Sequence, residues 1–108
     1  MQVQLPKPIA SYFLADKGDS ETIAACFTEI AVVKDEGKTY KGIDQIKQWK
    51  AAASNKYTYA IEILGCVEQN DLTVVTGRLT GNFPGNQIDL RYLFRIEADK
   101  IATLEIKV

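Results

Sequence analysis

The length, composition and charge of the chain already exclude several classes of protein. Its 108 residues, of which 46% are hydrophobic and 25% charged, fit one globular domain over residues 1–108 that buries its own core. Thirteen basic and fourteen acidic side chains nearly cancel, and the sequence pI is about 5.4. These values argue against a nucleic acid as partner, because nucleic-acid binders carry a strongly basic surface.

Two residue types that support catalysis in many enzymes are absent or scarce. Histidine does not occur, which removes the commonest general base and metal ligand, so we expect neither a metal site nor a cofactor. Cys26 and Cys66 stand far apart and are interpreted as small apolar side chains. The first residues lack the pattern of a signal peptide, and no window is apolar over the roughly 20 residues of a membrane span. We therefore expect a cytoplasmic protein with no membrane partner.

The first half of the chain has apolar side chains at the three- to four-residue spacing that is typical of helices. Helices are predicted over residues 6–17, 19–27 and 43–56. The first begins at Pro6 and Pro8, since proline suits the first turn of a helix, and the third carries Trp49 on its apolar face. Between the second and third helices the sequence predicts a strand over residues 30–34, a turn over 35–38 and a short returning strand over 39–41.

From Tyr57 onward the spacing changes to a period of two, which is typical of strands. Four long strands are predicted, over residues 57–68, 72–80, 87–97 and 101–108. Asn70 and Asp71 suit a tight turn between the first two, because both residues tolerate left-handed backbone angles. In the 57–68 strand, one face is predicted to hold Tyr57, Tyr59, Ile61, Ile63 and Val67, with Cys66 on the other. Helices followed by an antiparallel meander define an α+β fold.

Several local signals narrow this order of elements to one family. They are Gly18-Asp19, Phe27 ahead of a strand that ends in Asp35, Gly42 opening a helix with Ile46 and Trp49, and Phe94-Arg95-Ile96 followed by a turn and Lys100-Ile101. Their order and spacing resemble the nuclear-transport-factor-2-like superfamily, and within it most the SnoaL-like polyketide cyclases and the ketosteroid isomerases, over residues 9–106. The resemblance implies a cone-shaped half barrel, in which a curved antiparallel sheet packs on three N-terminal helices. It also implies a pocket for a small apolar molecule and a homodimer packed through the outer face of the sheet.

Asp35 is the candidate general base. It ends the first predicted strand, at the position where the resemblance places the general-base aspartate of the ketosteroid isomerases. Proton transfer next to a carbonyl requires a carboxylate in a dry pocket, with its pKa raised toward the working pH. The alternative is that Asp35 only caps the turn that follows it, as aspartate often does.

Two tyrosines are candidate hydrogen-bond donors to the negative charge that such a reaction develops. The resemblance implies a first-helix tyrosine and a protonated aspartate on a late strand in these roles. Here Tyr12 lies on the first helix; strict register places Ser11 at the position of that tyrosine, and Tyr12 matches it if one gap is allowed. Tyr92 stands where the late-strand aspartate would be. This replacement argues against steroid isomerase activity. The alternative is that both tyrosines pack in the core.

The remaining candidate side chains would bind the ligand. The expected pocket wall consists of Trp49, Tyr57, Tyr59 and Phe94, although aromatic residues on an apolar face are also ordinary core. Arg78 shares its strand parity with Leu72 and Val74, so we expect it to point inward, where it could anchor a carboxylate. Asp89 and Arg91 have the opposite parity to Tyr92 and are expected on the outer face.

Two functions remain open from the sequence. The first is a cofactor-independent isomerase, cyclase or dehydratase that acts on an apolar carbonyl compound, with Asp35 as its base. The second is a non-catalytic module of the same fold that binds a ligand or forms a dimer. The place of Asp35 favours the first function, whereas the lack of histidine and of inward-facing polar groups favours the second.

Overall fold

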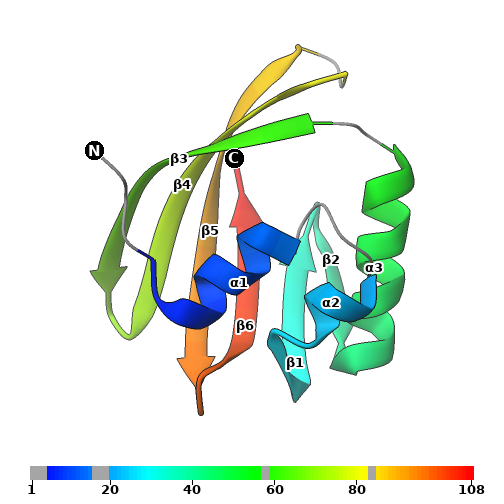
Figure 1. The fold of residues 1–108 in the computed structure, drawn as a ribbon, viewed down its shortest axis with the longest axis vertical. Coiled ribbons are helices and arrows are strands. Elements are labelled where there is room, and N and C mark those ends of the chain that lie inside the picture. Colours follow the sequence, from blue (N-terminus) through cyan, green and yellow to red (C-terminus); the bar gives the residue numbers. More distant parts are fainter. Residues whose placement is uncertain (1–4, 16–19, 57–58, 83–84) are drawn as a thin grey trace.

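The structure, a computed structural model, describes residues 5–15, 20–56, 59–82 and 85–108. The elements in chain order are α1 (Lys7–Ala15), α2 (Ser20–Ala24), β1 (Phe27–Asp35), β2 (Lys38–Lys41), α3 (Gly42–Lys56), β3 (Tyr59–Gln69), β4 (Leu72–Gly81), β5 (Gln87–Glu97) and β6 (Lys100–Lys107). Figure 1 shows the long strands bending over the helices, which confirms the predicted α+β fold with a curved, open sheet.

The six strands form one sheet in the order β2-β1-β6-β5-β4-β3. The predicted meander from β3 to β6 is confirmed, since each of these strands pairs antiparallel with the next. The pair β1–β6 is parallel instead, so the sheet is mixed rather than purely antiparallel. A parallel pair requires a long connection, and here that connection comprises everything between β1 and β6.

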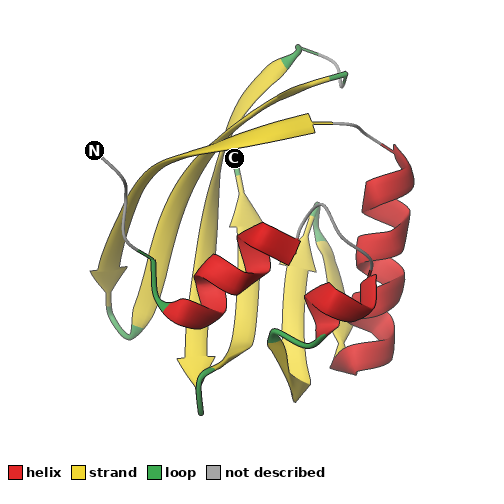
Figure 2. Cartoon of the chain, in the orientation of Figure 1, coloured by secondary structure: helices red, strands yellow, loops and turns green. Residues whose placement is uncertain are grey.

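The helices cover the concave side of the sheet (Figure 2). In the structure α3 packs against β1, β2 and α2, while α1 packs against β6 and α2. Their apolar side chains meet those of the strands in one core, whose largest fully buried members are Phe27, Phe94, Ile9, Ile23, Ile46, Ile101, Leu104, Val33 and Val75. Trp49, with 5% of its surface exposed, faces this core, as its place on the apolar face of the third predicted helix indicates.

The second predicted helix ends earlier than expected, and the first strand begins earlier. Helix α2 stops at Ala24, and Phe27 is already the first residue of β1. Phe27 pairs with Ile101, whose backbone N–H donates to the carbonyl oxygen of Cys26 at 2.8 Å. Pairing with the distant β6 therefore overrides the helical spacing of Ile23, Cys26 and Phe27.

A β-bulge changes which side chains of β3 face the core. The register of β3 against β4 shifts between Ile63 and Gly65. Because successive side chains alternate between faces, one extra residue transfers everything beyond it to the opposite face. Cys66 therefore pairs with buried Val75 and packs against the core, whereas Val67 has 56% of its surface exposed. The predicted places of Cys66 and Val67 were wrong for this reason; Ile61 and Ile63 do face the core.

Candidate functional site

Asp35 is the last residue of β1, and its carboxyl group is half-buried. The next two residues, Glu36 and Gly37, adopt positive φ angles of 53° and 76°, so the chain reverses into β2 and continues into α3. This turn brings α3 back over the end of β1. The indole Nε1–H of Trp49 on α3 donates a hydrogen bond to Oδ2 of Asp35 at 3.0 Å. The predicted base is thus held by a buried tryptophan.

The surroundings of Asp35 raise the pKa of its carboxyl group above the usual value. The largest cause is burial, which disfavours the ionised form. The hydrogen bond from Trp49 opposes it, the nearby Glu36 carboxylate adds to it, and the Lys50 ammonium opposes it. The smallest influence is a hydrogen bond from the backbone of Glu36, which is the turn-capping role considered from the sequence. A raised pKa is what a general base requires.

The two candidate tyrosines lie in an aromatic cluster of the core. Tyr12 has 2% of its surface exposed and Tyr92 has 4%. The ring of Tyr12 meets those of Phe94 and Phe13 edge to face, with centroids 5.6 and 5.1 Å apart. Tyr92 meets Phe13 in the same way at 5.1 Å and stacks on Phe94 at 6.3 Å. Phe94, predicted as pocket wall, is fully buried between them.

The strand register relates Asp35 to Tyr92. Lys34 pairs with Glu105, so Asp35 lies one residue further along, beside Ile106, and Ile106 pairs with Tyr92. The two residues therefore occupy one row across the sheet, two strands apart. At a strand spacing of about 4.8 Å, their backbones are roughly 10 Å apart.

A buried lysine that the sequence analysis missed lies next to this site. Lys50 follows Trp49 on α3 and has only 3% of its surface exposed. Its Nζ lies 3.4 Å from the hydroxyl oxygen of Tyr59 on β3 and 5.7 Å from the centroid of the Trp49 ring. The sequence did contain a signal, because Lys50 stands four residues after buried Ile46 and so shares its helix face.

The other predicted ligand-binding residues have different outcomes. Tyr59 packs against the core from the inner face of β3, whereas Tyr57 lies outside the described residues. The inward orientation predicted for Arg78 is wrong. Its Nε and Nη2 donate to Asp89 Oδ1 and Oδ2 at 2.9 and 3.2 Å, and both side chains are exposed. The parity argument failed because Leu72 and Val74 are only partly buried, while Thr73 and Val75 face the core.

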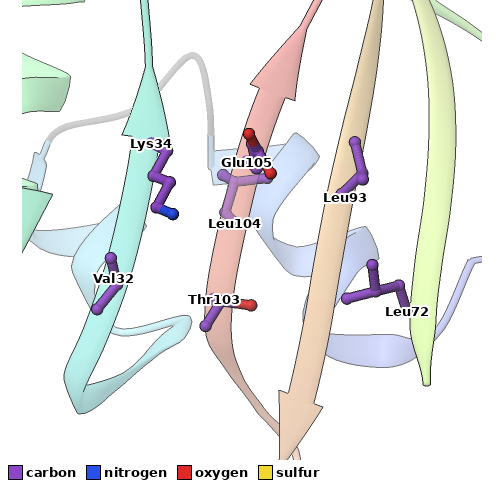
Figure 3. Close-up of a pocket in the computed structure, with 7 residues that line it drawn as sticks. All are labelled: Val32, Lys34, Leu72, Leu93, Thr103, Leu104 and Glu105. Atoms are coloured by element: carbon purple, nitrogen blue, oxygen red, sulfur yellow. The ribbon is translucent and has the colours of Figure 1, made fainter. Parts of the chain in front are cut away.

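A shallow depression lies on the opposite, outer face of the sheet (Figure 3). Its volume is about 180 Å³, and its lining residues are Val32, Lys34, Leu72, Leu93, Thr103, Leu104 and Glu105. Most of them alternate along the strands with buried residues such as Val33 and Phe94. Ligand pockets measure about 300–1,000 Å³, so this depression is too small for the expected ligand.

The described part of the chain has neither a metal-binding cluster nor a membrane-spanning helix. Among these residues, no group of three or more cysteine, aspartate or glutamate side chains gathers that could hold a metal ion. None of the helices described there has the length and apolar character required to cross a membrane.

Comparison with solved structures defines the class of fold. A protein of Catenulispora acidiphila with a ketosteroid isomerase-like fold, solved in complex with trimethylamine, superposes with a TM-score of 0.85 and 18% identity, over 97% of this chain and 87% of that one. The protein TerC, co-crystallised with polyporic acid, superposes with a TM-score of 0.79 and 17% identity, over 94% and 88% of the two chains. The protein therefore has the ketosteroid isomerase-like fold.

The amino-acid sequence assigns the chain to a family as well. Residues 10–104 match the model of the SnoaL-like domain, and the chain belongs to this family. A candidate polyketide cyclase from Sinorhizobium meliloti is 36% identical and superposes with a TM-score of 0.89, over 95% of each chain. No functionally curated protein sequence matches the chain.

Proposed function

We propose that this SnoaL-like protein binds a small apolar carbonyl compound and acts on it as a cofactor-independent isomerase, cyclase or dehydratase, with Asp35 as general base. The observation that carries the proposal is the state of Asp35. Its carboxyl group is half-buried, is oriented by the indole of Trp49, and has a raised pKa whose main cause is burial. The likeness to a candidate polyketide cyclase and to a protein co-crystallised with polyporic acid supports a small organic ligand.

In the proposed reaction Asp35 removes a proton from the carbon next to the ligand's carbonyl group. The electron pair of the broken C–H bond moves toward the carbonyl oxygen, giving an enolate. The hydrogen bond from Trp49 to Oδ2 orients the Asp35 carboxylate that receives the proton. Protonated Asp35 returns its proton in each case: to another carbon, which isomerises the ligand; to the alkoxide formed when the enolate carbon attacks a second carbonyl, which cyclises it; or to a β-hydroxyl group that leaves as water, which dehydrates it.

The hydroxyl groups of Tyr12 and Tyr92 are the proposed donors to the enolate oxygen. Tyr92 faces the same side of the sheet as Asp35, in the same row. A small molecule that contacts both side chains would have to span the roughly 10 Å between their backbones, over Ile106. Trp49, Tyr59 and Phe94 would form its apolar surroundings.

The proposal is tested by proton exchange at carbon. 2-Tetralone in D₂O is a suitable probe, because its acidic C–H groups next to the carbonyl exchange with deuterium and are followed by NMR. We expect the wild-type protein to accelerate exchange, and Asp35→Asn to reduce the enzymatic rate by about 10²–10⁴-fold. Asp89→Asn, on the outer face, is the matched control and should exchange at the wild-type rate. If the wild-type protein does not accelerate exchange, the non-catalytic alternative is the better account.

We also propose that the protein forms a homodimer and is located in the cytoplasm. The outer-face depression combines the apolar side chains of Val32, Leu72 and Leu93 with the opposite charges of Lys34 and Glu105, a composition that suits a self-complementary interface. Free thiols at Cys26 and Cys66 suit a reducing compartment. Light scattering at micromolar concentration should give the dimer mass for the wild type and the monomer mass for Leu93→Lys; a monomeric wild type would contradict the dimer.

A further inference from the structure

Tyr40 is an aromatic residue on β2, the short strand at one edge of the sheet. It pairs with Val33 of β1, and directly opposite residues of an antiparallel pair present their side chains on the same face. Val33 is fully buried, so Tyr40 also faces inward, where it packs half-buried against the core. No role for this residue was evident from the sequence.

The β1–β2 hairpin fixes where Tyr40 lies relative to Asp35. Asp35 pairs with Lys38, and successive side chains along a strand point to opposite faces. Asp35 and Tyr40 are therefore diagonal neighbours on the inner face, with backbones about 7–8 Å apart. Because the turn at Glu36 and Gly37 is tight, the hairpin sets this spacing by itself.

Trp49 contacts both of these residues from α3, which lies beside the hairpin (Figure 1). Its ring centroid is 6.2 Å from that of Tyr40, and the two ring planes are tilted by 39°. Its Nε1–H donates to Oδ2 of Asp35 at 3.0 Å. The indole therefore meets the carboxylate with its N–H edge while its ring packs against Tyr40.

Contacts on the indole ring are required to keep this N–H aimed at Asp35. Rotation about χ2 of an aromatic side chain is broad and roughly two-fold, and turning the indole over would carry its N–H away from the carboxylate. The ring of Tyr40 is one such contact, and the Nζ of Lys50, 5.7 Å from the indole centroid, is another. Lys50 belongs to the same helix as Trp49, whereas Tyr40 belongs to the hairpin that carries Asp35. Tyr40 therefore ties the indole to the strands that hold the carboxylate.

We propose that Tyr40 is a positioning residue, whose ring holds the Trp49 indole in the orientation that aligns the Asp35 carboxylate. The inference rests on the proposed function, because it assigns Tyr40 to the alignment of the same general base. Catalytic groups must be held within about 0.5 Å and 10–20° of the productive geometry by side chains that are themselves locked by packing. Tyr40 acts through its ring, since the ring is the part that meets the indole.

The experiment uses the indole of Trp49, the single tryptophan of the chain. Its one indole N–H resonance in NMR spectra should shift as the Asp35 carboxyl group ionises, because the two groups are hydrogen-bonded. Tyr40→Ala should abolish this pH-dependent shift and accelerate exchange of the indole N–H with water by about ten-fold or more. Tyr40→Phe keeps the ring and should restore both properties to the wild-type values.

The same variants should differ in deuterium exchange into 2-tetralone. Tyr40→Ala should reduce the enzymatic rate by about ten- to a hundred-fold, since misplacing a catalytic group by about 1 Å costs up to 10²-fold. The loss should appear in kcat rather than in KM, because Tyr40 acts on the base and not on the ligand. Tyr40→Phe should recover the rate.

Ile96→Ala is the matched control for a general loss of packing. Ile96 is half-buried like Tyr40 and packs against the same core. It lies in the row of Phe27, at the opposite end of β1 from Asp35. The variant should therefore keep the pH-dependent shift of the indole resonance. Tyr40→Leu, which keeps an apolar side chain but no planar ring, should lose the shift and replaces Tyr40→Ala if that variant does not fold.

Two results would overturn the inference: a folded Tyr40→Ala or Tyr40→Leu variant whose indole resonance keeps the wild-type pH dependence, and an equal loss of that dependence in Ile96→Ala. Failure of the proposed function gives a different result. If Asp35 is not a base, the wild-type protein does not accelerate 2-tetralone exchange, while Tyr40→Ala still loses the indole shift. If Tyr40 is not a positioning residue, the wild type accelerates exchange and Tyr40→Ala retains both the rate and the shift.

Discussion

Two parts of the same interior are organised by different interactions. Where α1 meets β5, four aromatic rings pack against one another with centroids 5.1–6.3 Å apart; they belong to Tyr12, Phe13, Tyr92 and Phe94. Beside α3, the interior instead contains a carboxyl group, an indole N–H, an ammonium group and a hydroxyl, from Asp35, Trp49, Lys50 and Tyr59.

The difference separates the packing that stabilises the fold from the groups that titrate. Packed rings stabilise the fold through buried area and dispersion, and these depend little on pH. Buried polar groups contribute less to stability and are costly when a partner is lost, but they include the groups that accept and donate protons. We therefore expect substitutions in the aromatic part to affect stability most, and substitutions in the polar part to affect pH dependence and binding.

The largest expected effect is in the aromatic part. Phe94→Ala removes a fully buried ring from the centre of the cluster and should lower the free energy of unfolding by about 3–5 kcal/mol. Denaturant titration at neutral and mildly acidic pH should give the same loss, since packing alone is changed. Phe94→Leu is the control and should lose less. A loss that varies strongly with pH would contradict the separation of the two parts.

A smaller effect is expected where the two parts meet, at Trp49. Trp49→Phe keeps most of the buried ring but removes the donor to Asp35 Oδ2, which should cost roughly 1–3 kcal/mol at neutral pH. Since that hydrogen bond lowers the pKa of Asp35, its loss should raise this pKa further. The cost should therefore diminish in acid, where the carboxyl group is protonated. NMR titration of the Asp35 carboxyl checks the direction, and a lowered pKa in the variant would contradict it.

The smallest effect is expected for Asp35→Asn. The folded-state pKa of Asp35 is raised, so folding disfavours the ionised form, and this penalty is present above the folded pKa and absent below the unfolded value of about 3.9. The asparagine has no charge, and its side-chain oxygen still accepts the Trp49 hydrogen bond. The variant should be at least as stable as the wild type at neutral pH, and any gain should vanish in acid. A variant that is less stable at neutral pH would indicate a turn cap instead.

Much of the fold could be predicted from local pattern. Period-two spacing and the Asn70-Asp71 turn, whose φ angles are 51° and 67°, predict the β3–β4 hairpin because the interactions involved are close in sequence. The parallel β1–β6 pair is not predictable in this way, because its two strands, Phe27–Asp35 and Lys100–Lys107, are far apart in the sequence. The bulge after Ile63 was not predicted, although Gly65 lies at the register shift and an isolated glycine inside a strand pattern is typical of a bulge.

The sequence by itself determined the α+β class, the family resemblance and the place of Asp35 at the end of a strand, since these depend on spacing along the chain. It did not determine which polar groups meet inside the fold. Arg78 and Lys50 are both basic residues on amphipathic elements, and only the tertiary structure decided that the first pairs with Asp89 outside and the second faces Tyr59 inside. The reason is physical: strand parity depends on register and bulges, and the buried face of a helix depends on what packs against it.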